Sequence, residues 1–340
     1  MPTPAERPTI AVLCERSSSP AESGSAASGG ELLLPPGLEG LEVEFRFCDA
    51  SELGEAVRGA RGLMLWDFFS TAVRDVWADA AAVEWIHVTA AGVDTLLFDE
   101  LRDSDVVVTN AQGVFDRPIA EYVLGAVIAH AKDSRRSFEF QRRQEWRHRE
   151  TQSILGAKAL IVGTGAIGRE TARLLRASGL QLRGAGRVAR SDDPDFGEIV
   201  ASSNLAAEVG WADHLVLAAP LTDATRGLVD AEVLAAMRPG AHLVNIARGP
   251  IVDETALLKA LSDVRIAATL DVFDREPLPP DHPLWAAPNA TITAHMSGDV
   301  IGWRDTLAAQ FATNVRRWLA GVPLLNVVDK KLGYIPTGAR

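Results

Sequence analysis

Short apolar runs alternate with polar or amphipathic segments along the first third of the chain. Runs of this kind, bounded by Gly, Pro, Asp and Ser, predict β-strands. The predicted strands cover residues 9–14, 41–47, 62–66, 83–88 and 106–109, and a short helix is predicted over 51–58. Residues 17–30, rich in Ser, Ala, Gly and Pro, are predicted to form a surface loop. The alternation of strands and helices predicts a small parallel α/β domain.

A helical pattern then runs from residue 118 to about 146. Asp116 is predicted to cap this helix, and Ile119, Val123 and Val127 recur on one side of it. Its later part, residues 132–149, is dense in Arg, Gln and Glu. We interpret that charge run as a solvated helix face rather than a nucleic-acid site.

The remainder of the chain repeats the strand and helix alternation. Strands are predicted at 159–162, 180–185, 215–219, 242–246, 265–270 and 291–293, with helices at 169–178, 231–237 and 255–261. A last helix is predicted over 304–320. Strands and helices of these lengths predict a second, doubly wound parallel sheet.

A glycine turn joins the first of these strands to its helix. Gly163, Gly165 and Gly168 have the G-x-G-x-x-G spacing, with Ala166 and Ile167 between the last two. The first glycine allows a tight turn, the second lets backbone approach a pyrophosphate, and the third lets the helix pack on the strand. The turn therefore predicts a dinucleotide held at the helix N-terminus.

Composition narrows the possible classes of protein. A length of 340 residues favours two domains, and the net charge of −11 argues against a general nucleic-acid surface. No apolar run is long enough to span a membrane, and residues 1–8 lack a signal-peptide core, so a cytoplasmic enzyme is expected. Cys14 and Cys48 are expected to be reduced core residues. No Cys or His spacing indicates a metal site.

Polar side chains follow the predicted strands of the second domain. Arg248, Glu276 and His295 come after three of these strands, and in a parallel sheet such ends meet at one edge. Arg248 can hold the carbonyl oxygen and carboxylate of a 2-oxo acid, and His295 can protonate the developing alkoxide. Glu276 can support the imidazolium form of His295. The set predicts carbonyl reduction beside a nicotinamide.

These segments resemble the D-isomer-specific 2-hydroxyacid dehydrogenase family. The resemblance runs from about residue 85 to about 314 and is carried by segments 159–168, 225–228, 237–241, 245–249, 270–279, 282–285 and 293–298. It implies that Arg248, Glu276 and His295 match the family's catalytic Arg, Glu and His. It also implies that Asp271 contacts the nicotinamide carboxamide and that the backbone around Ala91 and Gly92 receives the substrate carboxylate.

Further cofactor contacts are expected at the turn and at the strand ends. Besides the glycine turn, Asp271 and His295, the residues expected there are Ala219, Pro220, Thr225, Ala247 and Gly298.

The family's organisation implies a Rossmann nucleotide-binding domain inserted into a flavodoxin-like substrate domain. The substrate domain would comprise residues 1–112 and 302–340, and the nucleotide domain residues 113–301. The resemblance also implies a homodimer formed through the helix around residues 118–145.

The end of the second strand of the nucleotide domain departs from the pattern of the NAD-preferring members. An acidic residue bonds the ribose hydroxyls there in those members, whereas this chain has Gly186, followed by Arg187 and Arg190. An uncharged position beside two arginines suits a 2′-phosphate, so NADP is the expected cofactor, with NAD possible. The alternative is that both arginines are solvated and selectivity is weak.

The resulting hypothesis is an NADPH-linked oxidoreductase that converts a small 2-oxo acid, such as glyoxylate or hydroxypyruvate, into the D-2-hydroxy acid. A phosphoglycerate-type dehydrogenase is an alternative within the same class. A nucleotide-sensing binding protein without catalysis is an alternative from another class.

Three tryptophans, and all the histidines except His295, are interpreted as structural residues rather than catalytic ones. Trp66, Trp146 and Trp303 are interpreted as core or interface residues, with an approach to the substrate as the alternative. Six histidines are interpreted as structural because no catalytic partner is evident for them: His87, His130, His148, His214, His242 and His282.

Overall fold

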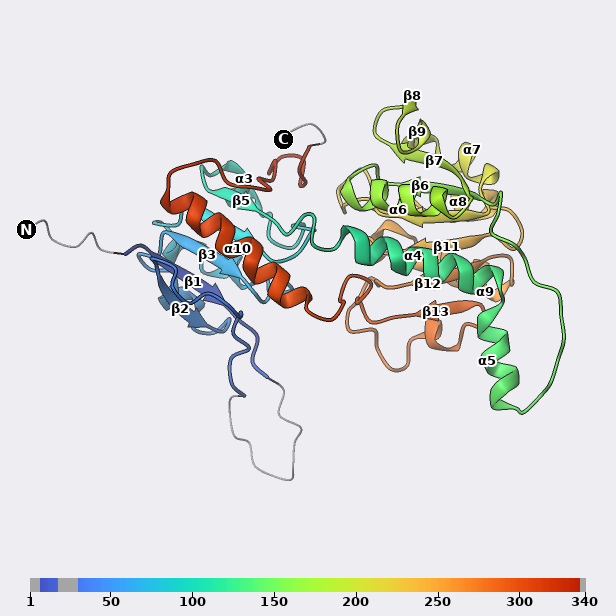
Figure 1. Cartoon of the computed structure of the whole chain (residues 1–340), viewed down its shortest axis with the longest axis horizontal. Coiled ribbons are helices and arrows are strands. Elements are labelled where there is room, and N and C mark those ends of the chain that lie inside the picture. Colours follow the sequence, from blue (N-terminus) through green and yellow to red (C-terminus); the bar gives the residue numbers. More distant parts are fainter. Residues whose placement is uncertain (1–6, 18–29, 337–340) are drawn as a thin grey trace, which may run out of the picture. The chain divides into compact units, whose positions relative to one another are not determined.

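The computed structural model describes residues 7–17 and 30–336, which fall into two compact units (Figure 1). Unit 1 combines the chain up to Val114 with the chain from Ile301 onward, and unit 2 is Phe115–Val300. Most of the predicted loop at 17–30 lies outside the described residues. Among the helices of the described part, none is long and apolar enough to cross a bilayer.

Unit 1 contains a five-stranded parallel sheet with the strand order β2-β1-β3-β4-β5. This is the order of flavodoxin-like folds, as expected. Its strands are β1 (Thr9–Leu13), β2 (Glu44–Cys48), β3 (Gly62–Leu65), β4 (Trp85–Val88) and β5 (Val107–Thr109). Its helices are α1 (Leu53–Ala56), α2 (Ala72–Asp75), α3 (Asp99–Asp103) and α10 (Trp303–Leu319).

Both faces of this sheet are buried, which explains why its strands are apolar runs rather than alternating ones. On one face, α10 packs through the fully buried Phe311, whose ring stacks on Trp85 at 5.5 Å. On the other, Leu53 of α1 and Leu101 of α3 join the apolar core. Cys14 and Cys48 are free and buried, which confirms the interpretation of both as reduced core residues.

Unit 2 contains an eight-stranded sheet with the order β13-β12-β11-β10-β6-β7-β9-β8. All neighbours are parallel except β8 and β9. The chain reverses direction across the sheet between β6 and β10, which is the switch point of a Rossmann-type fold. The strands are β6 (Lys158–Val162), β7 (Gln181–Gly186), β8 (Arg190–Asp193), β9 (Gly197–Ala201), β10 (His214–Leu217), β11 (His242–Asn245), β12 (Ala267–Leu270) and β13 (Ala290–Ile292).

Helices cover both faces of the second sheet (Figure 1). The helices α4 and α6 lie side by side on one face, and α7, α8 and α9 lie on the other. The helices of unit 2 are α4 (Asp116–Ala131), α5 (Ser134–Arg142), α6 (Ala166–Ala177), α7 (Leu205–Glu208), α8 (Ala231–Ala236) and α9 (Glu254–Ser262).

The single helix predicted from 118 to about 146 is wrong in two respects. Asp133 adopts a left-handed conformation with φ of 49°, which separates α4 from α5. Asp116 is the first residue of α4 and does not cap it; the N-cap position is Phe115. Neither feature has a periodicity signal, because residues 132–137 are all polar and carry no apolar spacing that could show where the helix breaks.

The arginine-rich segment after the break surrounds one aromatic ring. Phe140 of α5 is buried, and the guanidinium groups of Arg136, Arg143, Arg147 and Arg149 lie 5.2–5.7 Å from its ring centroid. Stacked arginines cover apolar surface while their charges stay hydrated. The charge run is therefore a solvated face, as interpreted, with an aromatic residue at its centre.

The short strands β8 and β9 were not predicted. They form an antiparallel pair after β7, with a register irregularity between Arg190 and Asp193. Residues 190–193 read Arg-Ser-Asp-Asp, a polar stretch without strand-like alternation. Pairing with β9, rather than any property of the segment itself, makes it a strand.

Three histidines gather at the amino ends of the central strands of unit 2. The rings of His130 and His242 stack at 4.4 Å, and His214 meets both rings edge-on. Burial lowers the pKa of all three, that of His214 to about 4. They are structural residues, His214 and His242 at the starts of β10 and β11 and His130 on α4, and they are neutral in the folded protein near pH 7.

These neutral histidines make the stability of unit 2 sensitive to acid. The unfolded chain binds their protons below about pH 6.5, whereas the folded chain resists protonation until lower pH. Stability is therefore complete above about pH 6.5 and falls as the pH drops to about 5, by at most about 1.4 kcal/mol per pH unit for each histidine. Urea unfolding between about pH 5 and 7 measures this slope. His214→Gln is expected to reduce the slope of unfolding free energy against pH. The control is His148→Gln, in an exposed loop, which should leave the slope unchanged. Equal slopes in both variants would contradict the assignment.

Candidate functional site

The glycine turn has the geometry that a pyrophosphate requires. Gly163 has φ of +106°, and a Cβ there would lie 2.5 Å from the backbone of Ala218. A Cβ at Gly168 would lie 1.9 Å from the carbonyl oxygen of Gly163, so only glycine allows the helix this close to the strand. Gly165 faces open space, since no heavy atom of the described residues comes within 4 Å of where its Cβ would lie.

The helix after the turn begins earlier than the sequence predicted. α6 starts at Ala166, so Ala166, Ile167 and Gly168 form its first turn. The first N–H groups of a helix have no partner within it. They and the open space at Gly165 fit a phosphate group, which the dipole at a helix N-terminus also favours.

Arg248, Glu276 and His295 are brought to one edge of the sheet. They follow β11, β12 and β13, which are adjacent strands of the same parallel sheet. His295 Nδ1 lies 2.7 Å from Glu276 Oε2. Arg248 lies in the turn after β11 and donates from Nη1 to the carbonyl of Ala247 at 2.7 Å. The predicted His–Glu contact is therefore present in the structure.

Glu276 remains ionised in this setting. Burial acts to raise its pKa, but the hydrogen bonds from His295 and from the backbone N–H of Phe273, with the charge of Arg248, bring it below the ordinary value. A carboxylate that keeps its charge can support a protonated imidazole next to it. The histidine side chain remains partly exposed, so its other nitrogen can reach a ligand.

Asp271 lies under the loop that carries His295. Its side chain is 0% exposed and accepts hydrogen bonds from Thr293 Oγ1 and from the backbone N–H groups of Met296 and Ser297. Its own carbonyl oxygen accepts from the N–H of His295 at 2.8 Å. The implied contact of Asp271 with a nicotinamide carboxamide stays a prediction; within the chain, this carboxylate holds the histidine loop.

The other residues expected at the cofactor lie in the loops that follow the strands. The side chain of Thr225 donates to the carbonyl of Pro220 at 2.7 Å, and the N–H of Ala247 donates to Asn245. Gly298 packs so closely on α4 that a Cβ would lie 2.7 Å from the ring of Phe115. Ala219, after β10, is buried. These loops are therefore held by hydrogen bonds and close packing before any ligand binds.

The two arginines expected at a 2′-phosphate follow β7 in the sequence. Gly186 is the last residue of β7, and Arg187 follows it on the surface. Arg190 lies on β8 and forms an ion pair with Asp193 at 3.0 Å, which its sequence context did not indicate. Asp193 also binds Arg169 of α6, and these contacts outweigh burial and lower its pKa. Part of the positive charge of Arg190 is thus opposed by a carboxylate.

In unit 1, Ala91 and Gly92 follow β4 and are half-buried. The side chain of Asn110 donates to the carbonyl of Ala91 at 2.6 Å, which fixes this loop. Trp66 is buried after β3, as a core residue. Trp303 begins α10, with its ring 6.2 Å from that of Phe68.

Trp146 is fully exposed, so it is not a core residue of this chain. Its alternative interpretation as an interface residue stays a prediction.

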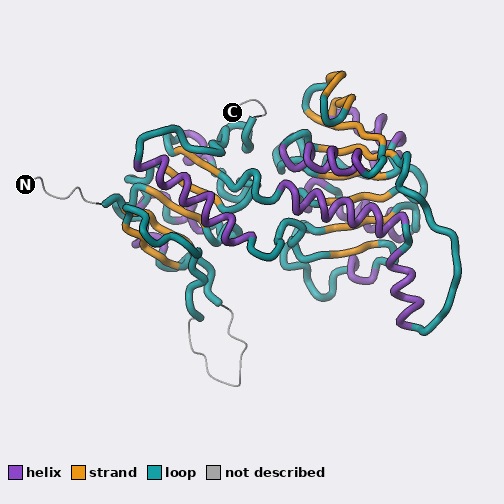
Figure 2. Tube along the Cα trace, in the orientation of Figure 1, coloured by secondary structure: helices purple, strands orange, loops and turns teal. Residues whose placement is uncertain are grey.

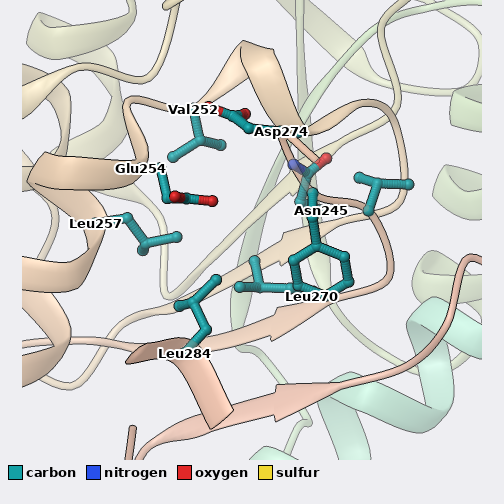
Figure 3. Close-up of a pocket in the computed structure, with 10 residues that line it drawn as sticks. Asn245, Val252, Glu254, Leu257, Leu270, Asp274 and Leu284 are labelled. Carbon is teal, nitrogen blue, oxygen red and sulfur yellow. The ribbon is translucent and has the colours of Figure 1, made fainter. Parts of the chain in front are cut away.

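His282 has a carboxylate partner, contrary to the sequence-based interpretation. Its Nε2 lies 3.0 Å from Glu254 Oε1, and its Nδ1 accepts from the N–H of Leu284. Glu254 also lines a small pocket beside the loop that leads to Glu276, with Asp274 at its rim and Leu257 among the leucines on its other side (Figure 3). The pair joins the start of α9 to the segment before β13, so His282 is structural despite its partner.

Two contributors to the site were missed by sequence reasoning. Tyr122 of α4 and Thr293 after β13 are hydrogen-bonded to each other and, through Thr293, to Asp271. Thr293 is part of the segment that carries the family resemblance, which was a usable signal. Tyr122 lies 171 positions away in sequence from Thr293, on a helix whose pattern indicates only packing.

Comparisons with known proteins agree with this geometry. The chain matches the model of the D-isomer specific 2-hydroxyacid dehydrogenase NAD binding domain over residues 124–297. It is 31% identical to human glyoxylate reductase/hydroxypyruvate reductase, with 81% of this chain and 86% of that protein covered. It is 35% identical to (S)-sulfolactate dehydrogenase of Chromohalobacter salexigens, with 67% and 75% covered.

A solved structure is also similar over nearly the full chain. The D-isomer specific 2-hydroxyacid dehydrogenase of Xanthobacter autotrophicus, in complex with NADPH and MES, has a TM-score of 0.77 and 29% identity, with 97% of this chain and 100% of that one covered. The family model covers the turn and the strand ends that carry Arg248, Glu276 and His295. The chain therefore belongs to the D-isomer specific 2-hydroxyacid dehydrogenases.

Proposed function

We propose that this enzyme uses NADPH to reduce a small 2-oxo acid of the glyoxylate or hydroxypyruvate type to the D-2-hydroxy acid. The observation that carries the proposal is the 2.7 Å contact between His295 Nδ1 and Glu276 Oε2, at the sheet edge where Arg248 also lies. The human relative is named for the same substrates, whereas the Chromohalobacter relative is named for sulfolactate. The names of both relatives refer to small acids, so the proposed substrate class is a small 2-oxo acid.

The cofactor, when bound, supplies the hydride that reaches the carbonyl carbon. His295 donates a proton from Nε2 to the carbonyl oxygen, and Glu276 holds Nδ1 and so fixes the orientation of the ring. Arg248 supplies forked donors for the carbonyl oxygen and the substrate carboxylate. That the backbone N–H groups around Ala91 and Gly92 bind the substrate carboxylate stays an implication of the family resemblance.

The cofactor site supports a preference for NADPH over NADH. Gly186 brings no carboxylate that would repel a 2′-phosphate, and Arg187 follows it directly. Arg187, which directly follows Gly186, is proposed as the main contact, and Arg190, which is paired with Asp193, as the secondary one. The solved NADPH complex of the Xanthobacter relative supports the same cofactor.

Of the two alternatives from the sequence, the site gives less support only to the binding protein. A binding protein without catalysis does not need the hydrogen bonds that hold Glu276 against His295 and Phe273. A phosphoglycerate-type dehydrogenase would use the same three residues, so only the substrate panel separates it from the proposed reductase. A cytoplasmic location stays a prediction.

We also propose a homodimer formed through the helical region around residues 118–145 that the resemblance implies, and in particular through the segment from α5 to residue 157. This segment extends away from the sheet of unit 2 (Figure 2). It exposes Phe138 at 64%, Leu155 at 77% and Trp146 at 100%, and α4 exposes Ile128 beside it. A group of large apolar side chains on one segment is typical of a protein interface, and a second copy is the partner that the resemblance implies.

His295→Asn is expected to lower kcat roughly a hundredfold to ten-thousandfold, since it removes the proton donor. Arg248→Lys is expected to lower kcat/KM by at least about tenfold because the forked donors are lost. The assay follows NADPH oxidation with glyoxylate, hydroxypyruvate, pyruvate and phosphohydroxypyruvate. The matched control is His282→Asn, which breaks the other His–Glu pair of unit 2. Near-normal turnover by the His295 variant would refute its role.

Arg187→Ser is expected to lower kcat/KM for NADPH by about tenfold to a hundredfold and to leave NADH almost unchanged, because a charged contact to the 2′-phosphate is lost. Arg190→Ser should have the smaller effect. Parallel kinetics with both cofactors provide the test, and Arg176→Ser, on the exposed side of α6, is the control. Comparable values for NADPH and NADH in the unmodified enzyme would contradict the preference.

Trp146→Asp combined with Phe138→Asp is expected to convert the dimer to a monomer, since two charges would be buried in the interface. Light scattering after size exclusion gives the mass directly. Trp285→Asp, which changes another exposed tryptophan of unit 2, is the control and should stay dimeric. A monomeric unmodified protein would exclude this interface.

A further inference from the structure

A chain of hydrogen bonds runs from α4 to the loop that carries His295. Tyr122 Oη lies 2.6 Å from Thr293 Oγ1, which donates to Asp271 Oδ1 at 2.5 Å. Thr293 has a single hydroxyl hydrogen, and it is used toward the carboxylate. Tyr122 must therefore be the donor of the first bond. The hydrogen bonds run in one direction, with each hydroxyl polarised by the next group.

Tyr122 is committed to this role by its surroundings. Burial raises its pKa to about 12, with Asp271 adding to the rise and the bond to Thr293 opposing it. The hydroxyl is therefore a donor throughout the physiological range. A half-buried hydroxyl that donates to a second hydroxyl, which in turn donates to a buried carboxylate, gives each of these three side chains a partner.

Asp271 connects these hydrogen bonds to the loop. Its Oδ1 accepts from Met296 N at 3.0 Å, and its Oδ2 accepts from Ser297 N at 2.9 Å. The residue before them, His295, has φ of +48°, a conformation that a residue with a Cβ rarely adopts. Such a backbone persists only where its surroundings hold it. The hydrogen bonds to Asp271 supply that hold directly after His295.

We propose that Tyr122 and Thr293 are positioning residues for catalysis, which fix the carboxylate of Asp271 and through it the left-handed backbone that aims His295. Neither side chain needs to contact the substrate. This inference rests on the proposed role of His295, but its structural part concerns the loop alone. It assigns to α4 a direct part in the geometry of the site.

Three full-length variants test the proposal. Thr293→Val keeps the shape and removes the hydroxyl, Thr293→Ser restores the hydroxyl, and Tyr122→Phe removes only the terminal donor. The control is Tyr334→Phe, which changes the other of the two tyrosines of the chain. Amide hydrogen exchange of a peptide covering 293–298 reports on the loop, with a peptide from β10 as the internal reference. Steady-state kinetics with NADPH and glyoxylate report on catalysis.

Thr293→Val is expected to speed exchange of the loop amides by about tenfold to a hundredfold, because a bond to a buried carboxylate is lost. The same variant should lower kcat by about tenfold or more, with KM for NADPH changed by less than about threefold. Tyr122→Phe should show the same pattern more weakly, and Thr293→Ser should return both readouts close to the unmodified values.

Unchanged loop exchange in both Thr293→Val and Tyr122→Phe would overturn the proposal. It would equally be overturned if exchange rose throughout unit 2 and Thr293→Ser gave no rescue, because the residues would then be merely structural. If the unmodified enzyme reduces none of the 2-oxo acids, the proposed function fails. The exchange data then still decide whether Tyr122 and Thr293 hold the loop.

Discussion

A single buried carboxylate organises the site. Asp271 directly follows β12 with a side chain that water does not reach, and a charge in that position must be satisfied by donors of the chain itself. Its donors come from the loop after β13, so satisfying the charge also fixes the path of that loop. The left-handed backbone at His295 lies directly before the two N–H groups that satisfy this charge. In the mechanism that we propose, catalytic geometry thus depends on how one buried charge is balanced.

The parallel sheet supplies the second constraint. Because β11, β12 and β13 are parallel neighbours, their carboxyl ends lie at the same edge of the sheet, and the residues that follow them lie close together. Arg248, Glu276 and His295 are separated in sequence by 28 and 19 positions, yet all follow adjacent strands. The close approach of Gly168 to Gly163 does the same for the phosphate end, by bringing the start of α6 onto β6. One edge of the sheet therefore holds both the proposed cofactor and the reacting groups.

The contacts that an arginine makes within the chain limit the ligands that its charge can bind. Arg190 counts as a free cation when read from the sequence, but Asp193 lies at 3.0 Å from it and also binds Arg169. Likewise, the arginines after α4 surround Phe140 rather than lining a nucleic-acid groove. In both cases the local partner, rather than the charge itself, sets the role.

The sequence by itself determined every strand except β8 and β9, the parallel character of both sheets and the three residues at the strand ends. Apolar runs and glycine spacing are local properties, and a parallel sheet converts the order of strands into a common edge, so that the His–Glu contact could be predicted without coordinates. Tertiary structure alone decided the break at Asp133, the β8–β9 pair, the partner of Arg190 and the link from Tyr122 to Asp271. The Tyr122–Thr293 contact joins residues 171 positions apart. The break at Asp133, the β8–β9 pair and the ion pair between Arg190 and Asp193, three positions apart, depend on local backbone conformations that no residue pattern encodes. Whether two polar side chains form a hydrogen bond depends on the distance between them in the folded chain, and the order of residues in a sequence does not give that distance.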